Sequence, residues 1–443
     1  MKQHSAQAPI RVQPGRHGWI ALSITALLAL QCASAEVPVG LDIDELHGTL
    51  DEIVDESPLM SRLGQAVQTL EGYGLFLDVE IAYRNLMQSI LQSVDQRSSL
   101  LTDDMEETLR RRRDGWVYDT GVTPEFPEEG VRIGLVRDED DPELADLQGT
   151  TLLRINEHEV ENQGLFILKR ALRSTEAKPV TLVVRDTEGQ VVTQTVQRVA
   201  HQLPDLEEPE LLPFQLGYLR VHVLRHETGP AVSAALDEWA EAGSYGALLD
   251  LRGADGSSLD AVANIAERFA AAGTFLFAYR DLADQDLIVR TAEHDEALDM
   301  PLMVLVDEQT GGAAEVLAAV LSDSVRGVML FGQQTSGDLL IRDRVQLDDE
   351  LAAYIAIRRL ATGGDRVYDG MSGIRPDVVT ALNDISHPPT RSGRTAILDE
   401  QVEQEAMYNR IRGDATMRRA VDVLLGLKAL DIRPHGSLPR PTP

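Results

Sequence analysis

The sequence predicts an α/β fold with α+β parts: a helical N-terminal region, a small β domain, a mixed, mostly parallel α/β sheet domain and a helical C-terminal tail. Three observations support this prediction. Apolar residues recur at helical spacing before residue 114, short strand-like runs follow between 115 and 198, and strands alternate with helices from Leu216 onward. Alternation of this kind is typical of parallel strands joined by helical crossovers.

The predicted elements follow in chain order. Residues 82–91 form a helix, and Thr102 with the acids behind it caps the next one. Strands at 149–156 and 180–185 flank a helix near 165–172. In the α/β part we expect strands at 217–223, 247–251, 301–306 and 328–331, with helices near 229–242, 257–272 and 313–323, and a tail helix over 396–430.

Segment boundaries follow from these elements and from shifts in composition. We predict a signal peptide (1–35), a helical region (36–114), a β domain (115–198), a Pro- and acid-rich linker (199–214), an α/β domain (215–382), and a helical tail with a Pro-rich end (383–443).

The first segment resembles an export signal. Lys2, Arg11 and Arg16 precede an apolar run over 19–30, which leads to small residues ending at Ala35. Cleavage after Ala35 would make the protein periplasmic or secreted; an uncleaved signal acting as a membrane anchor is the alternative.

Charge and cysteine content limit the function further. The formal net charge of -31 repels phosphate, so nucleic acids and anionic membranes are not expected partners. The only cysteine, Cys32, lies in the predicted signal, so the exported chain would have neither disulfide nor thiol chemistry. We predict no cofactor and no metal; in particular, there is no HExxH motif.

Several motifs resemble the carboxyl-terminal processing, or tail-specific, serine protease family. Residues 301–315 (PLMVLVDEQTGGAAE) align without a gap on PLVVLVNEGSASASE, and 249–260 on LDLRNNPGGLLD. GYLRV at 217–221 is similar to GYIRI, and GIRPDVV at 373–379 to GIEPDVV. Residues 143–156 resemble a segment of the PDZ domain that this family carries. The likeness extends over roughly residues 80–380 and identifies the β domain as PDZ-like and the α/β domain as tail-specific-protease-like.

This resemblance implies a domain that captures substrate C-termini and a Ser-Lys dyad, but the residues of the dyad are replaced. Gly312 stands at the position of the nucleophilic serine, Asp338 at that of the lysine, and Arg342 at that of a supporting glutamine. Moreover, no lysine occurs between Lys178 and Lys428, which excludes a Ser-Lys dyad within the α/β domain independently of any alignment.

Other positions could still bind. The family's oxyanion donors correspond to Gly256 and to Gly312 with Ala313 at a helix N-terminus, although these glycines are also ordinary turn residues. The carboxylate-binding loop corresponds to Gly121 and Val122. Two residues near this loop depart from the family: the acid Asp119 would repel a terminal carboxylate, and Pro124 has no N–H to donate to a captured strand. Separately, the basic run 110–113 is either a solvated helix face or a site for an acidic partner.

Three functions therefore remain open. The first is a non-catalytic relative (a pseudoprotease) that binds peptide or protein C-termini, or a partner protein of the cell envelope. The second is an active serine endopeptidase with relocated residues, which would need one of the nearby hydroxyls and a histidine–carboxylate pair: Ser257, Ser258, Thr310, Ser322 or Ser336, with His222 or His226 and Glu227. The third is an assembly scaffold that forms a homo-oligomer.

Overall fold

The computed structural model describes residues 58–73, 78–125, 130–137, 142–161, 165–174, 176–281, 285–294, 296–348, 351–363, 366–368, 370, 372–380, 408, 411 and 413–434. The predicted signal peptide, the Pro-rich end and most of the first half of the predicted tail helix lie outside these residues. Within them, no helix has both the length and the apolar character needed to cross a membrane.

The chain divides into two units, Met1–Asn85 and Leu86–Pro443. In the first unit the structure describes α3 (Pro58–Gly72) and the beginning of α4 (Val79–Val94). α4 has one exposed Glu80–Arg84 pair at i,i+4 spacing, which is of little energetic consequence. All further elements belong to the second unit.

A mostly parallel sheet organises the second unit, as predicted. Its order is β11 (Glu210–Leu212), β12 (Leu216–Arg220), β14 (Gly246–Asp250), β18 (Leu302–Val306), β19 (Val328–Gly332) and β23 (Val378–Val379). Only the β11–β12 pair is antiparallel. A small parallel pair, β13 (Val223–Leu224) with β15 (Asp255–Gly256), extends beyond the strand ends.

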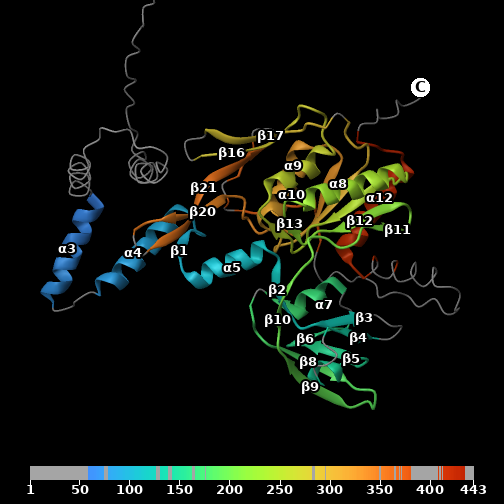
Figure 1. Ribbon diagram of the computed structural model, residues 1–443, viewed down its shortest axis with the longest axis horizontal. Coiled ribbons are helices and arrows are strands. Elements are labelled where there is room, and N and C mark those ends of the chain that lie inside the picture. Colours follow the sequence, from blue (N-terminus) through green and yellow to red (C-terminus); the bar gives the residue numbers. More distant parts are fainter. Residues whose placement is uncertain are drawn as a thin grey trace, which may run out of the picture. The chain divides into compact units, whose positions relative to one another are not determined.

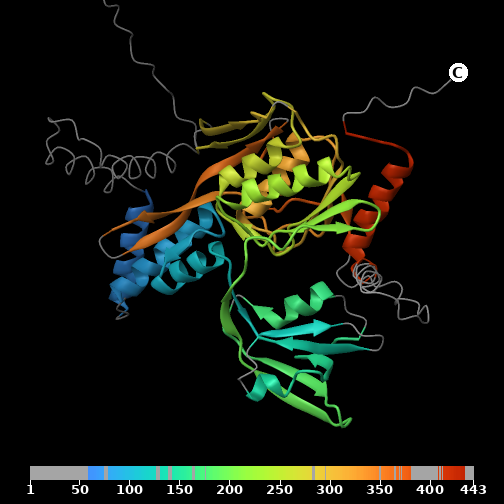
Figure 2. The same ribbon diagram turned by 45° about the vertical axis from the view of Figure 1, so that its right-hand side comes forward.

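Helices cover both faces of this sheet, which explains why its central strands are largely apolar, with Arg220 and Asp250 at strand ends as exceptions (Figures 1 and 2). α8 (Thr228–Glu241), α9 (Leu259–Glu267) and α10 (Gly312–Ser324) pack on one face, and α12 (Ala415–Ala429) packs on the other. In β18, Val304 packs into the core on the side of α8, α9 and α10, whereas its neighbours Met303 and Leu305 pack into the core on the side of α12. Successive side chains of a strand point to opposite faces of the sheet.

A second, antiparallel sheet has the order β1 (Ser99–Leu101), β21 (Ala352–Thr362), β16 (Phe275–Arg280) and β17 (Asp286–Thr291), and β20 (Ile341–Gln346) and β22 (Arg366–Val367) also pair with β21. β1 lies within the region predicted as helical. It is followed by α5 (Asp103–Arg113), whose N-terminal cap is Thr102, as expected from the sequence.

A small β domain, residues 116–202, has a core of its own. Its main sheet has the order β3 (Val122–Glu125), β4 (Val131–Val136), β5 (Thr151–Ile155), β8 (Val180–Arg185) and β9 (Val191–Val196), with β6 (His158–Glu159) on β5. The helices are α6 (Pro142–Ala145) and α7 (Leu165–Leu172). A smaller sheet of the same domain has the order β10 (Val199–Gln202), β2 (Trp116–Asp119) and β7 (Arg173–Ser174). The predicted linker over 199–214 thus contains β10 and β11.

Candidate functional site

The loop between β18 and α10 is held rigidly against the loop that follows β14. Thr310 is fully buried and donates its hydroxyl hydrogen to the carbonyl oxygen of Leu251 at 2.9 Å. The N–H of Gly311 donates to the carbonyl oxygen of Ala254, also at 2.9 Å. On the other side, the Gly253 N–H donates to Asp307 Oδ1 at 2.8 Å. These bonds place the first turn of α10 beside Asp255 and Gly256.

Gly312, the first residue of α10, is closed to a side chain. Its φ is 52°, in the left-handed region that favours glycine. A Cβ added there would lie 2.3 Å from Asp255 Oδ1 and 2.6 Å from the carbonyl oxygen of Gly256, both far inside contact distance. The position that corresponds by resemblance to the nucleophile is therefore blocked by a carboxylate of the chain itself.

That carboxylate also uses the nearby backbone donor. The Gly256 N–H donates to Asp255 Oδ1 at 2.7 Å, and Arg112 from α5 forms an ion pair with Asp255. Burial raises the pKa of the Asp255 carboxyl above its usual value, while the Arg112 charge and the Gly256 N–H oppose the rise. The N–H that corresponds to an oxyanion donor thus already has an acceptor.

Glu315, in the first turn of α10, holds the turn that carries the lysine-equivalent position. Its carboxylate accepts hydrogen bonds from the hydroxyls of Thr335 and Ser336 and from the N–H groups of Gly337 and Asp338, the last three at 3.0, 2.6 and 2.5 Å. Burial raises the pKa of Glu315, and these four donors counteract the rise.

Asp338 itself belongs to an ion-pair chain. Arg342 donates to Asp338, and also to both oxygens of Asp95, at 2.8 Å through Nε and 3.0 Å through Nη2. The Arg342 side chain is only 2% exposed. Burial alone would raise the pKa of Asp95, but the Arg342 bonds and charge bring it below its usual value. The side chains at the two family-equivalent positions, Asp338 and Arg342, are therefore bonded to each other.

The histidines named as possible bases lie in other contacts. His222 Nε2 is 3.3 Å from Glu207 Oε1; burial lowers the pKa of His222, and the pKa of Glu207 is lowered to about 2, because His222 and nearby cations outweigh its burial. His226 Nδ1 is 4.0 Å from Asp260 Oδ2. Across the described residues, neither ring has a hydrogen bond to one of the candidate hydroxyls.

Three candidate hydroxyls have structural partners, including that of Thr310, which donates to the Leu251 carbonyl oxygen. Ser258 caps α9 by accepting from the Ala261 N–H at 3.2 Å, and Ser336 donates to Glu315. The described residues contain no group of three or more His, Cys, Asp or Glu side chains with the geometry to hold a metal ion.

Sequence reasoning missed Asp255, Arg112 and Asp95. Asp255 could have been noticed, because it replaces the proline of the LDLRNNPGGLLD pattern directly before Gly256. Arg112 and Asp95 carry no local signal: they reach the site from α5 and from the segment before β1, more than a hundred residues away in sequence.

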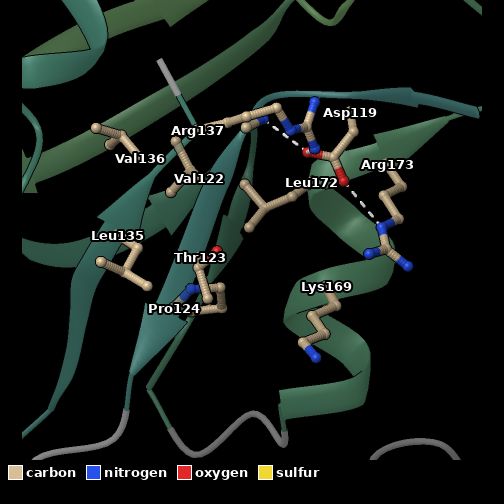
Figure 3. Close-up of a pocket in the computed structure, with 11 residues that line it drawn as sticks. Asp119, Val122, Thr123, Pro124, Leu135, Val136, Arg137, Lys169, Leu172 and Arg173 are labelled. Atoms are coloured by element: carbon tan, nitrogen blue, oxygen red, sulfur yellow. Dashed lines mark hydrogen bonds and ion pairs between the residues drawn. The ribbon is translucent and has the colours of Figure 1, made fainter. Parts of the chain in front are cut away.

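A pocket of about 320 Å³ lies in the small β domain, between β3 and α7 (Figure 3). It is lined by Gly121, Val122 and Pro124, together with Asp119. Asp119 accepts from the Gly121 N–H at 2.6 Å, and it forms ion pairs with two arginines that Figure 3 shows on either side of it.

Comparison with known proteins connects this architecture to a family. Residues 215–380 match the sequence model of peptidase family S41. A carboxyl-terminal-processing protease of Synechocystis sp. is 30% identical over 181 residues, which is 41% of this chain and 40% of the relative. A chloroplastic C-terminal processing peptidase of Tetradesmus obliquus is 31% identical over 164 residues, 37% of this chain and 35% of the relative.

The matched part of the chain thus spans less than two thirds of either relative. Among solved structures, a photosystem II D1 C-terminal processing protease aligns with a TM-score of 0.45 and 20% identity, covering 77% of this chain and 88% of that chain. Residues 215–380 of this chain therefore form a peptidase family S41 domain, and the chain is a homologue of C-terminal processing proteases.

Proposed function

We propose that this protein is a non-catalytic member of its family, which binds peptide or protein segments without cleaving them. The observation that carries the proposal is the Asp255 carboxylate, which occupies the space beside Gly312 and accepts the hydrogen of the Gly256 N–H. A serine peptidase needs a nucleophile, a base and free oxyanion donors. In this chain the position of the nucleophile is Gly312, which has only a hydrogen atom as its side chain, and the Gly256 N–H already donates to Asp255.

The base is missing as well. Asp338 is a carboxylate bonded to the buried Arg342, and no lysine lies anywhere between residues 178 and 428. A carboxylate held by the Arg342 guanidinium therefore stands where the family has a lysine amine. The surrounding scaffold remains well packed, which supports a function in binding.

A second candidate rests on the Ser336–Glu315 hydrogen bond at 3.0 Å, since a hydroxyl beside a buried carboxylate could be activated as a nucleophile. Glu315 accepts three further bonds, however, and these fix it as the centre of a turn. We therefore expect Ser336 to stabilise that turn and not to attack substrate.

The test uses the chain from residue 36 onward, incubated with reduced, alkylated α-lactalbumin carrying an apolar C-terminal tag. We expect chemical cross-linking to capture the substrate and mass spectrometry to find no cleavage product after prolonged incubation. Turnover that disappears in Ser336→Ala but persists in the control Ser322→Ala would establish the second candidate and reject the first. Absence of both cross-linking and cleavage would favour an assembly role.

We further propose that the protein is exported and that its mature form begins at Glu36. The basic, apolar and small-residue segments before this position support the proposal. N-terminal sequencing of the protein purified from its native cells tests it: a chain that retains residues 1–35 would show that the signal is not cleaved.

A further inference from the structure

The pocket between β3 and α7 carries an inference that rests on the proposed binding function and names the class of ligand. The pocket has an apolar wall formed by Val122, Pro124 and Leu172. At one end lies the loop over 119–122, whose N–H groups could in principle receive an anion. The question is what those donors already bind.

Asp119 occupies that end of the pocket. It is 6% exposed, and Oδ1 accepts from the Gly121 N–H at 2.6 Å and from Arg137 Nη2 at 3.0 Å. Oδ2 accepts from Arg173 Nε at 2.9 Å. One carboxylate therefore takes a backbone donor and two guanidinium groups, which is the set of partners that an incoming carboxylate would need.

Two further positions of the loop and strand have no backbone donor to offer. The Val122 N–H donates to the Thr120 hydroxyl at 3.3 Å. Pro124, two residues along β3, has no N–H at all. β3 is the edge strand of its sheet, so an added strand would have to pair with it, and the loss of these donors weakens such pairing.

Recognition in this pocket must then come mainly from side chains. Among the apolar residues that line the pocket, Val122, Pro124 and Leu172 are buried, and Leu135 is 56% exposed. Lys169 on α7, four residues before Arg173, adds positive charge to the side of the pocket opposite β3 (Figure 3). An extended peptide segment could place an apolar side chain against the apolar residues of the pocket and an acidic side chain near Lys169, and neither contact requires a chain end.

We propose that Asp119 is a built-in substitute for a terminal carboxylate, so that this pocket binds internal, extended segments of a polypeptide and does not select free C-termini. A free terminus would bring a second carboxylate to a place where Asp119 already uses the backbone and guanidinium donors that the terminus would need. An internal segment brings no such charge to that end of the pocket.

Two pools of decapeptides test the proposal. Both pools have one acidic residue followed by four varied apolar positions, and they differ only in a terminal carboxylate or carboxamide, distinguished by an isotope label. The immobilised chain from residue 36 onward is incubated with an equal mixture, and the retained peptides are measured by mass spectrometry. For the unsubstituted protein we expect a carboxylate-to-carboxamide ratio within twofold of one.

The variant Asp119→Asn removes the charge while keeping the shape, and should leave the Arg137 and Arg173 charges without a partner. We expect it to retain the carboxylate pool at least tenfold over the carboxamide pool. The matched control is Asp186→Asn, which alters an acid of a turn in the same domain that also accepts backbone N–H bonds, and which should leave the ratio near one.

A tenfold carboxylate preference in the unsubstituted protein would overturn the proposal, and so would an unchanged ratio in a folded Asp119→Asn variant. Retention of neither pool by the unsubstituted protein would also overturn it, because the pocket would then not be a peptide site. If Asp119→Asn does not fold, the comparison in the unsubstituted protein still decides. Cleavage of retained peptides would contradict the proposed non-catalytic function alone and leave the assignment of Asp119 intact.

Discussion

Replacing Arg342 by methionine is expected to lower the free energy of unfolding of the S41 domain by about 3–5 kcal/mol, the usual cost of removing one partner of a buried ion pair. The Arg342 side chain is 2% exposed and bonds to Asp95 and Asp338. Without the guanidinium group, Asp95 would keep a buried charge with no cation bonded to both of its oxygens. Asp338 would lose its closest cation as well.

Arg344→Met on the same strand provides the control. Arg344 is 49% exposed and lies 3.7 Å from Glu106, so we expect a change of no more than about 0.5 kcal/mol. Urea unfolding followed by tryptophan fluorescence and circular dichroism measures both variants. If Arg342→Met were no more destabilising than Arg344→Met, the ion-pair chain would not support the fold as described.

The second large effect is expected at Gly312. Gly312→Ala should cost about 3 kcal/mol, because it adds the steric penalty of a left-handed φ to an overpacked contact with Asp255 and Gly256. Gly243→Ala separates the two contributions. Gly243 has a similar positive φ of 74°, but an added Cβ would meet nothing within 4 Å, so only the backbone penalty of about 1 kcal/mol should remain.

A double-mutant cycle then identifies Asp255 as the obstacle. In an Asp255→Ala background the cost of Gly312→Ala should fall by about 1–2 kcal/mol, because the closest atom to the new Cβ has been removed. The Gly256 carbonyl oxygen remains, so the cost should not vanish. Strict additivity of the two substitutions would show that the carboxylate does not fill the space beside Gly312.

The sequence was a good guide to the fold of the second unit. Buried parallel strands are largely apolar and alternate with helices, and this pattern is local enough to be recognised in the sequence. The antiparallel sheet containing β16, β17, β20 and β21 was not predicted. The short strands β1, β10 and β11 were not predicted either, because three or four residues give too little periodicity. The partner of β1 is also distant, since β1 pairs with β21, some 250 residues later.

The candidate site could be located from the sequence, but its chemistry could not. The gapless alignment placed Gly312, and the absence of lysine excluded one mechanism. The side chains that now fill the site are Asp255 with Arg112, and Arg342 with Asp95, and both pairs join distant segments. A spacing pattern cannot reveal such contacts. The basic run 110–113, interpreted as a solvated helix face or a site for an acidic partner, contributes Arg112 to this site and Arg113 to a contact with Tyr354.

The two proposed binding regions share one physical feature. Asp255 accepts the Gly256 N–H beside Gly312, and Asp119 accepts the Gly121 N–H beside β3. In each case a carboxylate of the chain takes a backbone donor that a substrate would otherwise use, and arginine balances its charge. In the proposed function, Asp255 acts against catalysis and Asp119 acts against capture of a chain end, and both leave the surrounding residues in place.

Covalent labelling tests the central claim most directly. The chain from residue 36 onward, folded as shown by circular dichroism, is treated with a fluorophosphonate probe, and intact mass and tryptic peptides are measured. Because no activated hydroxyl lies at Gly312 and Ser336 is bonded to Glu315, we expect no stoichiometric adduct. A single modified serine in the S41 domain, whose labelling is lost on heat denaturation, would contradict the account.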